Sequence, residues 1–162
     1  MSLSYRQIDS PVGPLLLAGD AAGLAVLWFA GTERPVTIDS AWTPDGGALD
    51  GVRKELDEYF EGRLRRFTTR LNFRGTPFQQ QVWTALCDIP YGETISYAEL
   101  ARRIRNPNAV RAVGLANGQN PIAIIVPCHR VIGSNGSLTG YGGGLPTKKA
   151  LLELERGERR LL

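Results

Sequence analysis

The sequence of 162 residues predicts an α+β fold, with a small N-terminal antiparallel sheet and helix joined to a mostly helical C-terminal part that contains a helix-turn-helix. Three short apolar runs separated by turn residues predict the sheet. Two capping boxes, each followed by apolar residues at helical spacing, predict helices in the second half. A composition of 43% hydrophobic and 22% charged residues is typical of a globular protein with a packed core.

Three strands are expected near the N-terminus, because apolar residues recur between clusters of Pro, Gly, Asp and Ser. The connections between them are short, which favours an antiparallel meander. The expected strands are Leu3–Asp9, Pro14–Gly19 and Leu24–Ala30. The next segment, Thr32–Gly47, is polar and rich in Pro and Gly and is expected to be a loop.

The N-terminal part is expected to finish with a helix and a strand. Ala48–Glu61 has apolar residues at helical spacing, and Gly62 follows as a C-cap. Arg66–Phe73 alternates between apolar and polar residues, which predicts one more strand. A boundary near Arg74-Gly75 then separates a support domain, residues 1–74, from a second domain, residues 75–162.

Four helices are expected in the second domain. The first has Thr76 as its N-cap and ends before Pro90, and the last opens at Leu145-Pro146 and ends at Gly157. Between them, a helix from Ser96 through Ile104 and another from Asn106-Pro107 to about Gly118 are joined by a tight polar turn. Two short helices joined in this way are typical of a helix-turn-helix, although hairpins of helices with a purely structural role are also common.

The second helix of this pair has an unusual composition. Arg111 is its lone charge, and the residues around it are small: Ala109, Ala112, Gly114 and Ala116. Such a helix can approach a DNA groove closely, but it has few side chains that could read base edges. Charge is also uneven, since residues 1–75 hold nine basic and ten acidic residues and residues 76–162 hold ten and six. The second half is therefore expected to bind a polyanion.

A reactive turn is predicted at Pro127–Arg130. The apolar run Ile124–Val126 predicts a short buried strand that leads to Cys128, His129 and Arg130. A thiol beside a base and a permanent cation is a place where a thiolate can form, although a buried, unreactive cysteine is the alternative. Cys128 and Cys87 are the two cysteines, so no disulfide framework is expected and a reduced, cytoplasmic setting follows.

Glu155 falls on the apolar side of the last helix, among Leu151, Leu152 and Leu154. A buried carboxylate requires a partner, because its desolvation alone costs several kcal/mol. Two partners are open at this point. Lys148 lies on the same side about two turns earlier, and His129 belongs to the reactive turn.

The run Asn117–Ile132, which contains Pro-Cys-His-Arg, and the later Gly140–Gly144 closely resemble the O6-alkylguanine-DNA alkyltransferases, also called methylated-DNA–protein-cysteine methyltransferases. The resemblance extends from about Phe78 to Glu155, and Ser10–Pro14 resembles a turn in the family's N-terminal part. It implies a single-turnover repair protein that flips O6-alkylguanine out of duplex DNA and moves the alkyl group to its own cysteine.

The resemblance implies a role for each matching residue. Cys128 would accept the alkyl group, His129 would take its proton through a water, and Glu155 would orient His129. Asn120 would brace the turn and Tyr97 would donate a proton to the leaving guanine. Arg111 would fill the gap left in the base stack, while Tyr141 and Val131, through its carbonyl, would contact the base. Further substrate or DNA contacts are expected from Arg130, Asn106, Ala112, Gly114, Ser134, Gly142 and Lys148.

Gly142 departs from the family's pattern, because some relatives have a serine there that binds the guanine oxygen. No metal or other cofactor is expected, since one histidine and Cys87 cannot form the zinc site of some relatives. The expected partner is double-stranded DNA carrying alkylated guanine, with no membrane, and the protein is expected to be a monomer that acts singly or cooperatively on DNA. Rival functions are a non-enzymatic damage sensor, a transcriptional regulator and a cysteine hydrolase. Cys128 argues against the damage sensor, and the sparse helix around Arg111 argues against the regulator. The lack of an evident oxyanion hole argues against the hydrolase.

Overall fold

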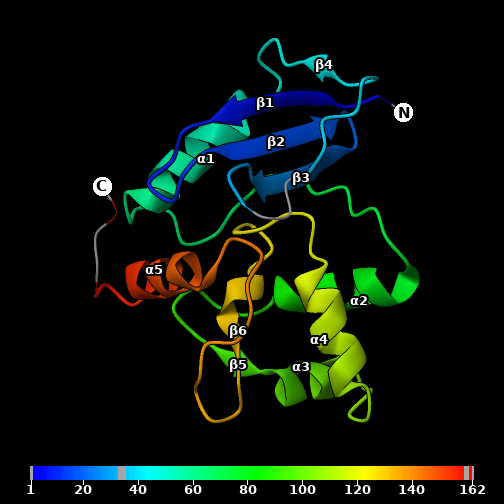
Figure 1. The fold of residues 1–162 in the computed structure, drawn as a ribbon, viewed down its shortest axis with the longest axis vertical. Helices are drawn as coiled ribbons and strands as arrows, with labels where there is room; N and C mark the ends of the chain where they lie inside the picture. Colours follow the sequence, from blue (N-terminus) through cyan, green and yellow to red (C-terminus); the bar gives the residue numbers. More distant parts are fainter. Residues whose placement is uncertain (1, 33–35, 159–160, 162) are drawn as a thin grey trace.

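A four-stranded sheet with one helix lies above the remaining helices (Figure 1). The structure is a computed structural model, and it describes residues 2–32, 36–158 and 161. Residues 33–35 of the expected loop lie outside the described residues. The mixed α+β architecture expected from the sequence is confirmed.

The sheet is built from the expected antiparallel meander. β1 (Ser4–Ile8) pairs with β2 (Leu15–Asp20), and β2 pairs with β3 (Gly23–Phe29), in both cases antiparallel. The strand order is β3-β2-β1-β4, in which β4 (Thr43–Pro44) runs parallel to β1. This short strand lies in the segment expected to be a loop.

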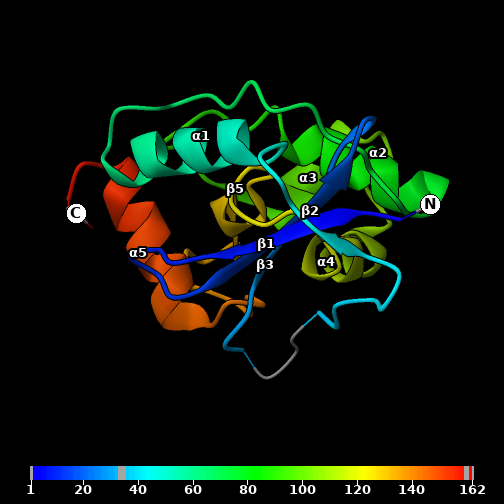
Figure 2. The same cartoon turned by 90° about the horizontal axis from the view of Figure 1, so that it is seen from above.

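Helix α1 (Asp50–Phe60) lies within the expected range and packs beside the sheet (Figure 2). It buries Val52, Leu56, Tyr59 and Phe60. Gly62 follows with φ of 78°, a left-handed conformation that glycine adopts without steric cost.

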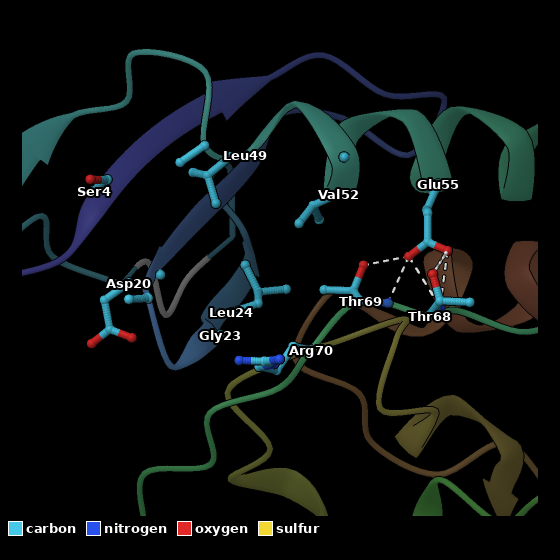
Figure 3. Close-up of a pocket in the computed structure, with 14 residues that line it drawn as sticks. Ser4, Asp20, Gly23, Leu24, Leu49, Val52, Glu55, Thr68, Thr69 and Arg70 are labelled. Atoms are coloured by element: carbon cyan, nitrogen blue, oxygen red, sulfur yellow. Dashed lines mark hydrogen bonds between the residues drawn. The ribbon is translucent and has the colours of Figure 1, made fainter.

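The strand expected over Arg66–Phe73 is wrong. Only Leu71 forms a bridge, with Leu24, and the rest of this segment has no strand pairing in the structure. The reason is the carboxylate of Glu55 on α1, which accepts hydrogen bonds from the amides of Thr68 and Thr69, each at 2.9 Å, and from both hydroxyls (Figure 3). Amides that donate to a side chain are not available to a neighbouring strand.

The second half contains the four expected helices: α2 (Pro77–Leu86), α3 (Tyr97–Arg103), α4 (Val110–Gly118) and α5 (Leu145–Glu155). The capping box of Thr76 and Gln79 on α2 is confirmed. At α3, Ser96 accepts from the amide of Glu99, but the carboxylate of Glu99 forms ion pairs with Arg102 and Arg103 instead. Two short strands, β5 (Ile95–Ser96) and β6 (Val131–Ile132), pair in parallel and were not expected.

Helix α4 begins later than expected. Asn106–Ala109 forms a turn, in which the Ala109 amide donates to the Asn106 carbonyl at 3.0 Å, and α4 starts at Val110 without a side-chain cap. Arg105 before this turn has a left-handed φ of 61°, which reverses the chain sharply between α3 and α4. α3 and α4 are therefore two short helices joined by a tight turn, as a helix-turn-helix requires.

One continuous hydrophobic core joins the sheet to the helices below it. It runs from Leu15, Leu17 and Leu27 of the sheet to Trp83 of α2 and Leu151 of α5. Where the chain is described, none of its helices is long and apolar enough to cross a membrane. The shared core fixes the sheet relative to the segment that carries Cys128.

Candidate functional site

Cys128 lies in a buried turn. The strand expected over Ile124–Val126 is wrong, because residues 123–125 form a turn in which Ile124 has a left-handed φ of 71°. Cys128–Arg130 then forms a single 3-10 turn. All three of its side chains are buried. A bulky β-branched residue with positive φ is strained, so the surrounding contacts must hold this turn in place.

Asn120 supplies two of those contacts. Its side-chain amide donates to the Val126 carbonyl at 2.8 Å, and its side-chain oxygen accepts from the Ile122 amide at 3.0 Å. Asn120 also lowers the pKa of the Cys128 thiol. The side chain thus bridges both ends of the turn.

The carboxylate of Glu155 is the centre of a buried network. It lies 2.7 Å from His129 Nε2, and it accepts from Arg130 Nε at 2.8 Å and Nη2 at 3.1 Å. Tyr59 of α1 donates to it at 2.6 Å and the Gly92 amide at 3.3 Å. Of the two partners considered for Glu155, His129 is therefore the one in contact. Burial alone would raise the pKa of Glu155, but His129 and Arg130 outweigh it and hold that pKa far below its usual range.

His129 is fully buried, and burial lowers its pKa below the usual value even though the charge of Glu155 opposes this. The imidazole is therefore neutral at pH 7. Its Nε2 faces Glu155, and its Nδ1 has no hydrogen-bond partner among the described protein atoms. A neutral imidazole held at one nitrogen by a carboxylate can take up a proton at the other.

Burial also raises the pKa of the Cys128 thiol, and Asn120 and the charge of Lys148 offset only part of this rise. Lys148 is fully buried and donates from Nζ to the Val131 carbonyl at 2.7 Å and to the Thr139 carbonyl at 3.1 Å. Burial lowers the pKa of Lys148, and the negative charge that Cys128 can carry opposes this. The thiol is thus held protonated but close to a cation.

A cleft of about 1010 Å3 opens between the helix-turn-helix, β3 and the loop that precedes α5. Its lining includes Tyr97, Arg111 and Gly114 on one side, and Trp28 with the Gly140–Gly144 loop on the other. Cys128 does not line the cleft. The Tyr141 hydroxyl is buried, and burial and the nearby Cys128 raise the pKa of Tyr141. Tyr141 thus lines the cleft, and its pKa also responds to the charge that Cys128 can carry.

The glycine loop packs on two aromatic rings of β3. A Cβ atom at Gly142 would lie 2.4 Å and 2.5 Å from atoms of the Trp28 ring, and one at Gly143 would lie 2.7 Å from the Phe29 ring. The Phe29 ring also packs edge-on against Tyr141, with 5.6 Å between centroids. Trp28 thus fills the space that a larger side chain at position 142 would need.

Two groups of the expected site residues are brought together. The buried group comprises Cys128, His129, Glu155, Asn120, Val131, Arg130 and Lys148, and the cleft group comprises Tyr97, Arg111, Gly114, Tyr141 and Gly142. Arg130, expected at the substrate or DNA, instead directs its guanidinium to Glu155 and the Ile89 carbonyl. Lys148 is likewise buried and bonds carbonyls. Outside both groups are three exposed residues, Asn106, Ala112 and Ser134.

Four residues of the site were missed in the sequence: Tyr59, Gly92, Trp28 and Thr139. Tyr59 and Trp28 belong to the N-terminal part and reach the site only through tertiary packing. Their apolar spacing in a helix and a strand indicated core positions and nothing more. Thr139, whose Oγ1 lies 2.6 Å from the Tyr97 hydroxyl, stands next to the Gly140–Gly144 segment and was the most accessible to sequence reasoning.

A second cavity, of about 600 Å3, lies between α1, the turn of β2 and β3, and residues 68–70 (Figure 3). It contains none of the expected site residues, and the carboxylate of Glu55 at its edge is occupied by Thr68 and Thr69. Within the described parts of the chain, no group of three or more His, Cys, Asp or Glu side chains could hold a metal ion.

Known proteins match this chain over nearly its whole length. Residues 3–73 match the ribonuclease-like domain of 6-O-methylguanine DNA methyltransferase, and residues 77–157 match the DNA-binding domain of the same family. A methylated-DNA–protein-cysteine methyltransferase of Mycobacterium tuberculosis is 58% identical over 155 residues, which are 95% of this chain and 93% of the relative. One of Methanosarcina mazei is 54% identical over 151 residues, 93% of this chain and 96% of the relative.

Solved structures of similar proteins also superpose on this chain. The crystal structure of Mycobacterium tuberculosis OGT in complex with DNA superposes with a TM-score of 0.89 at 57% identity, covering 96% of this chain and 94% of that one. The O6-methylguanine-DNA methyltransferase of Pyrococcus kodakaraensis superposes with a TM-score of 0.67 at 27% identity, covering 94% and 98%. The chain therefore belongs to the 6-O-methylguanine DNA methyltransferase family.

Proposed function

We propose that this protein repairs double-stranded DNA by transferring the alkyl group of O6-alkylguanine to Cys128, once per molecule. The observation that carries the proposal is the contact of 2.7 Å between His129 Nε2 and Glu155, where His129 directly follows the buried Cys128, in a chain that also has a cleft lined by its helix-turn-helix. Family membership and the methyltransferase relatives support the same reaction.

The thiol needs a base, because its pKa is raised by burial. His129 is neutral and its Nε2 is held by Glu155, so its Nδ1 is the nitrogen that can receive a proton. Neighbouring side chains of a helical turn diverge, and Cys128 and His129 are not hydrogen-bonded to one another, so we assign the transfer to a bridging water. The imidazolium then formed is stabilised by the carboxylate of Glu155.

The thiolate attacks the alkyl carbon of the substrate in an SN2 step. The carbon–sulfur bond forms as the bond from the carbon to O6 of guanine breaks, and the electron pair of that bond stays on the base. Tyr97, which lines the cleft, would give its proton to the leaving base. The product is a thioether without a good leaving group, so each molecule reacts once.

The target base must leave the helix to reach Cys128. Flipping costs a few kcal/mol, which contacts of α4 with the DNA and the insertion of Arg111 would offset. Arg111 is exposed and lines the cleft, and the small residues Ala112 and Gly114 near it permit close approach to a groove. The DNA complex of the Mycobacterium tuberculosis relative supports DNA as the partner. We further infer a monomer in the cytoplasm.

The test is the intact mass of the protein after incubation with a duplex that contains O6-methylguanine. We expect one methyl group per molecule, located on Cys128 by peptide mapping. Cys128→Ser should take up none, and Cys87→Ser should react like the wild type, because Cys87 belongs neither to the reactive turn nor to the lining of the cleft. Binding without any adduct would favour the damage sensor, and several turnovers per molecule or an adduct on Cys87 would exclude the proposed reaction.

A further inference from the structure

The hydroxyl groups of Tyr97 and Thr139 lie 2.6 Å apart, and either oxygen can be the donor. Tyr97 is the first residue of α3, in the helix-turn-helix, whereas Thr139 belongs to the loop between β6 and α5. Both side chains are half-buried. The contact joins the side of the cleft that carries Arg111 to the loop that leads into Gly140–Gly144.

The position of Thr139 is fixed from the opposite side. Its carbonyl accepts from Lys148 Nζ at 3.1 Å, and the same ammonium donates to the Val131 carbonyl at 2.7 Å. Lys148 is fully buried and lies on α5, so the loop is anchored to a helix and to the residue after the reactive turn. A hydroxyl held in this way loses little further entropy when it binds a partner.

A phenol that gives its proton to a leaving base acquires negative charge on its oxygen as the transfer proceeds. A hydroxyl donor already within hydrogen-bond distance stabilises that charge without reorganisation. Thr139 can supply this donor only if its own hydrogen points to the tyrosine. The proton of Tyr97 is then free to point toward the cleft.

We propose that Thr139 is a positioning residue for the alkyl transfer, which acts by donating a hydrogen bond to the Tyr97 oxygen and so directs the tyrosine proton to the leaving guanine. The inference rests on the proposed function. As the bond from the alkyl carbon to O6 breaks, the phenol proton passes to a ring nitrogen of the base, and the phenolate keeps the hydrogen bond of Thr139. The proton of the thiol leaves separately through His129, and solvent exchange restores both groups.

The test is a double-mutant cycle in single-turnover kinetics on an O6-methylguanine duplex, with Thr139→Val, Tyr97→Phe and the double variant. Thr139→Val keeps the shape and removes the hydroxyl. We expect its limiting rate to fall about ten- to hundred-fold, the effect of one hydrogen bond to a developing charge. The duplex concentration that gives half the limiting rate should not change. In the Tyr97→Phe background, Thr139→Val should cause no further loss.

Two controls separate this role from a structural one. Thr139→Ser retains a hydroxyl and should recover most of the rate, and Thr84→Val, on the exposed face of α2, should react like the wild type. Melting temperatures are measured first, and Thr139→Ala replaces Thr139→Val in the cycle if the latter does not fold. The role of Thr139 would be overturned if Thr139→Val left the limiting rate unchanged, or if it weakened the apparent affinity for the duplex and not the rate. It would also be overturned if Thr139→Val caused the same loss of rate in the wild type and in Tyr97→Phe. If the wild type itself forms no adduct on Cys128, the proposed function fails instead.

Discussion

Tyr59 on α1 donates a hydrogen bond of 2.6 Å to the carboxylate of Glu155 on α5, across 96 residues of sequence. The bond is buried, and burial and the charge of Glu155 raise the pKa of Tyr59 well above its usual value, so the phenol stays a donor. The N-terminal part is thus joined to the network that holds His129. The same carboxylate bonds His129 and Arg130, so a change at Tyr59 reaches the reactive turn.

Tyr59→Phe should lower the free energy of unfolding by about 1.5–3 kcal/mol, because the variant removes one buried hydrogen bond to a charged group and keeps the ring. Urea unfolding at pH 7 measures the change. Tyr5→Phe on β1 is the matched control, since Tyr5 is half-buried and its ring packs against Trp42 away from the site. If Tyr59→Phe and Tyr5→Phe lower the free energy of unfolding equally, the hydrogen bond to Glu155 makes no net contribution to stability.

Glu155→Gln should destabilise the protein by about 3–5 kcal/mol at pH 7, since it leaves the buried Arg130 without its carboxylate. The difference in unfolding free energy between the variant and the wild type should become smaller as the pH falls. Because the pKa of Glu155 is lowered in the fold, its contribution is complete above the unfolded value, about 4.3, and is lost as the pH falls toward the folded value.

Urea unfolding of both proteins at pH 7, 4 and 2.5 checks this, and the gap between them should narrow from the first pH to the last. Other acids that titrate in this range, such as Asp45 and Glu55, are common to the two proteins and cancel in the difference. A gap that stays constant with pH would mean that packing, and not the charge of Glu155, is lost in the variant.

Much of the fold could be predicted from the sequence because its signals are local. The capping box of Thr76 and Gln79, the meander of β1 to β3, and Gly62 after α1 depend on neighbours within a few residues. The expected strand at Arg66–Phe73 failed because its amides are bound by Glu55 on another element. The strand expected before Pro127 failed because an isoleucine there adopts a left-handed conformation, in a turn held by Asn120 and by backbone hydrogen bonds.

The site could be predicted in part for the same reason. The side of α5 on which Glu155 lies follows from helical periodicity, but the choice of His129 over Lys148 as its partner required the fold. Lys148 is about two turns away on the same helix and points to carbonyls of the loop. Trp28 could not be found at all, because its place beside Gly142 depends on how the sheet packs against the second half.

Gly142→Ala should destabilise the protein by about 1–3 kcal/mol, because the added methyl group would overlap the ring of Trp28. Gly140→Ala is the control in the same loop, since a Cβ at that position meets nothing within 4 Å. Adding Trp28→Leu to Gly142→Ala makes room for the methyl group and should recover part of the loss. Thermal melting of the four proteins measures this, and equal costs at positions 140 and 142 would contradict the contact with Trp28.

Arg111→Ala should slow repair of duplex DNA far more than reaction with a free base. If Arg111 fills the gap left by the flipped nucleotide, its loss costs the duplex reaction the energy that offsets unstacking, on the order of a few kcal/mol, or about ten- to hundred-fold in rate. Free O6-benzylguanine needs no flipping and should react with Arg111→Ala at nearly the wild-type rate, because the guanidinium is exposed on α4 outside the network of Cys128.

Arg70→Ala is the matched control, since Arg70 is also an exposed arginine but lines the cavity near α1 in place of the cleft. It changes the net charge by the same amount, so any general weakening of attraction to DNA appears equally in both variants. The rates with an O6-methylguanine duplex and with O6-benzylguanine are compared for the three proteins. If Arg111→Ala slows the reactions with the duplex and with the free base equally, Arg111 supports the reactive turn and does not act in flipping. If Arg111→Ala and Arg70→Ala slow the duplex reaction equally, Arg111 contributes only general charge attraction to DNA.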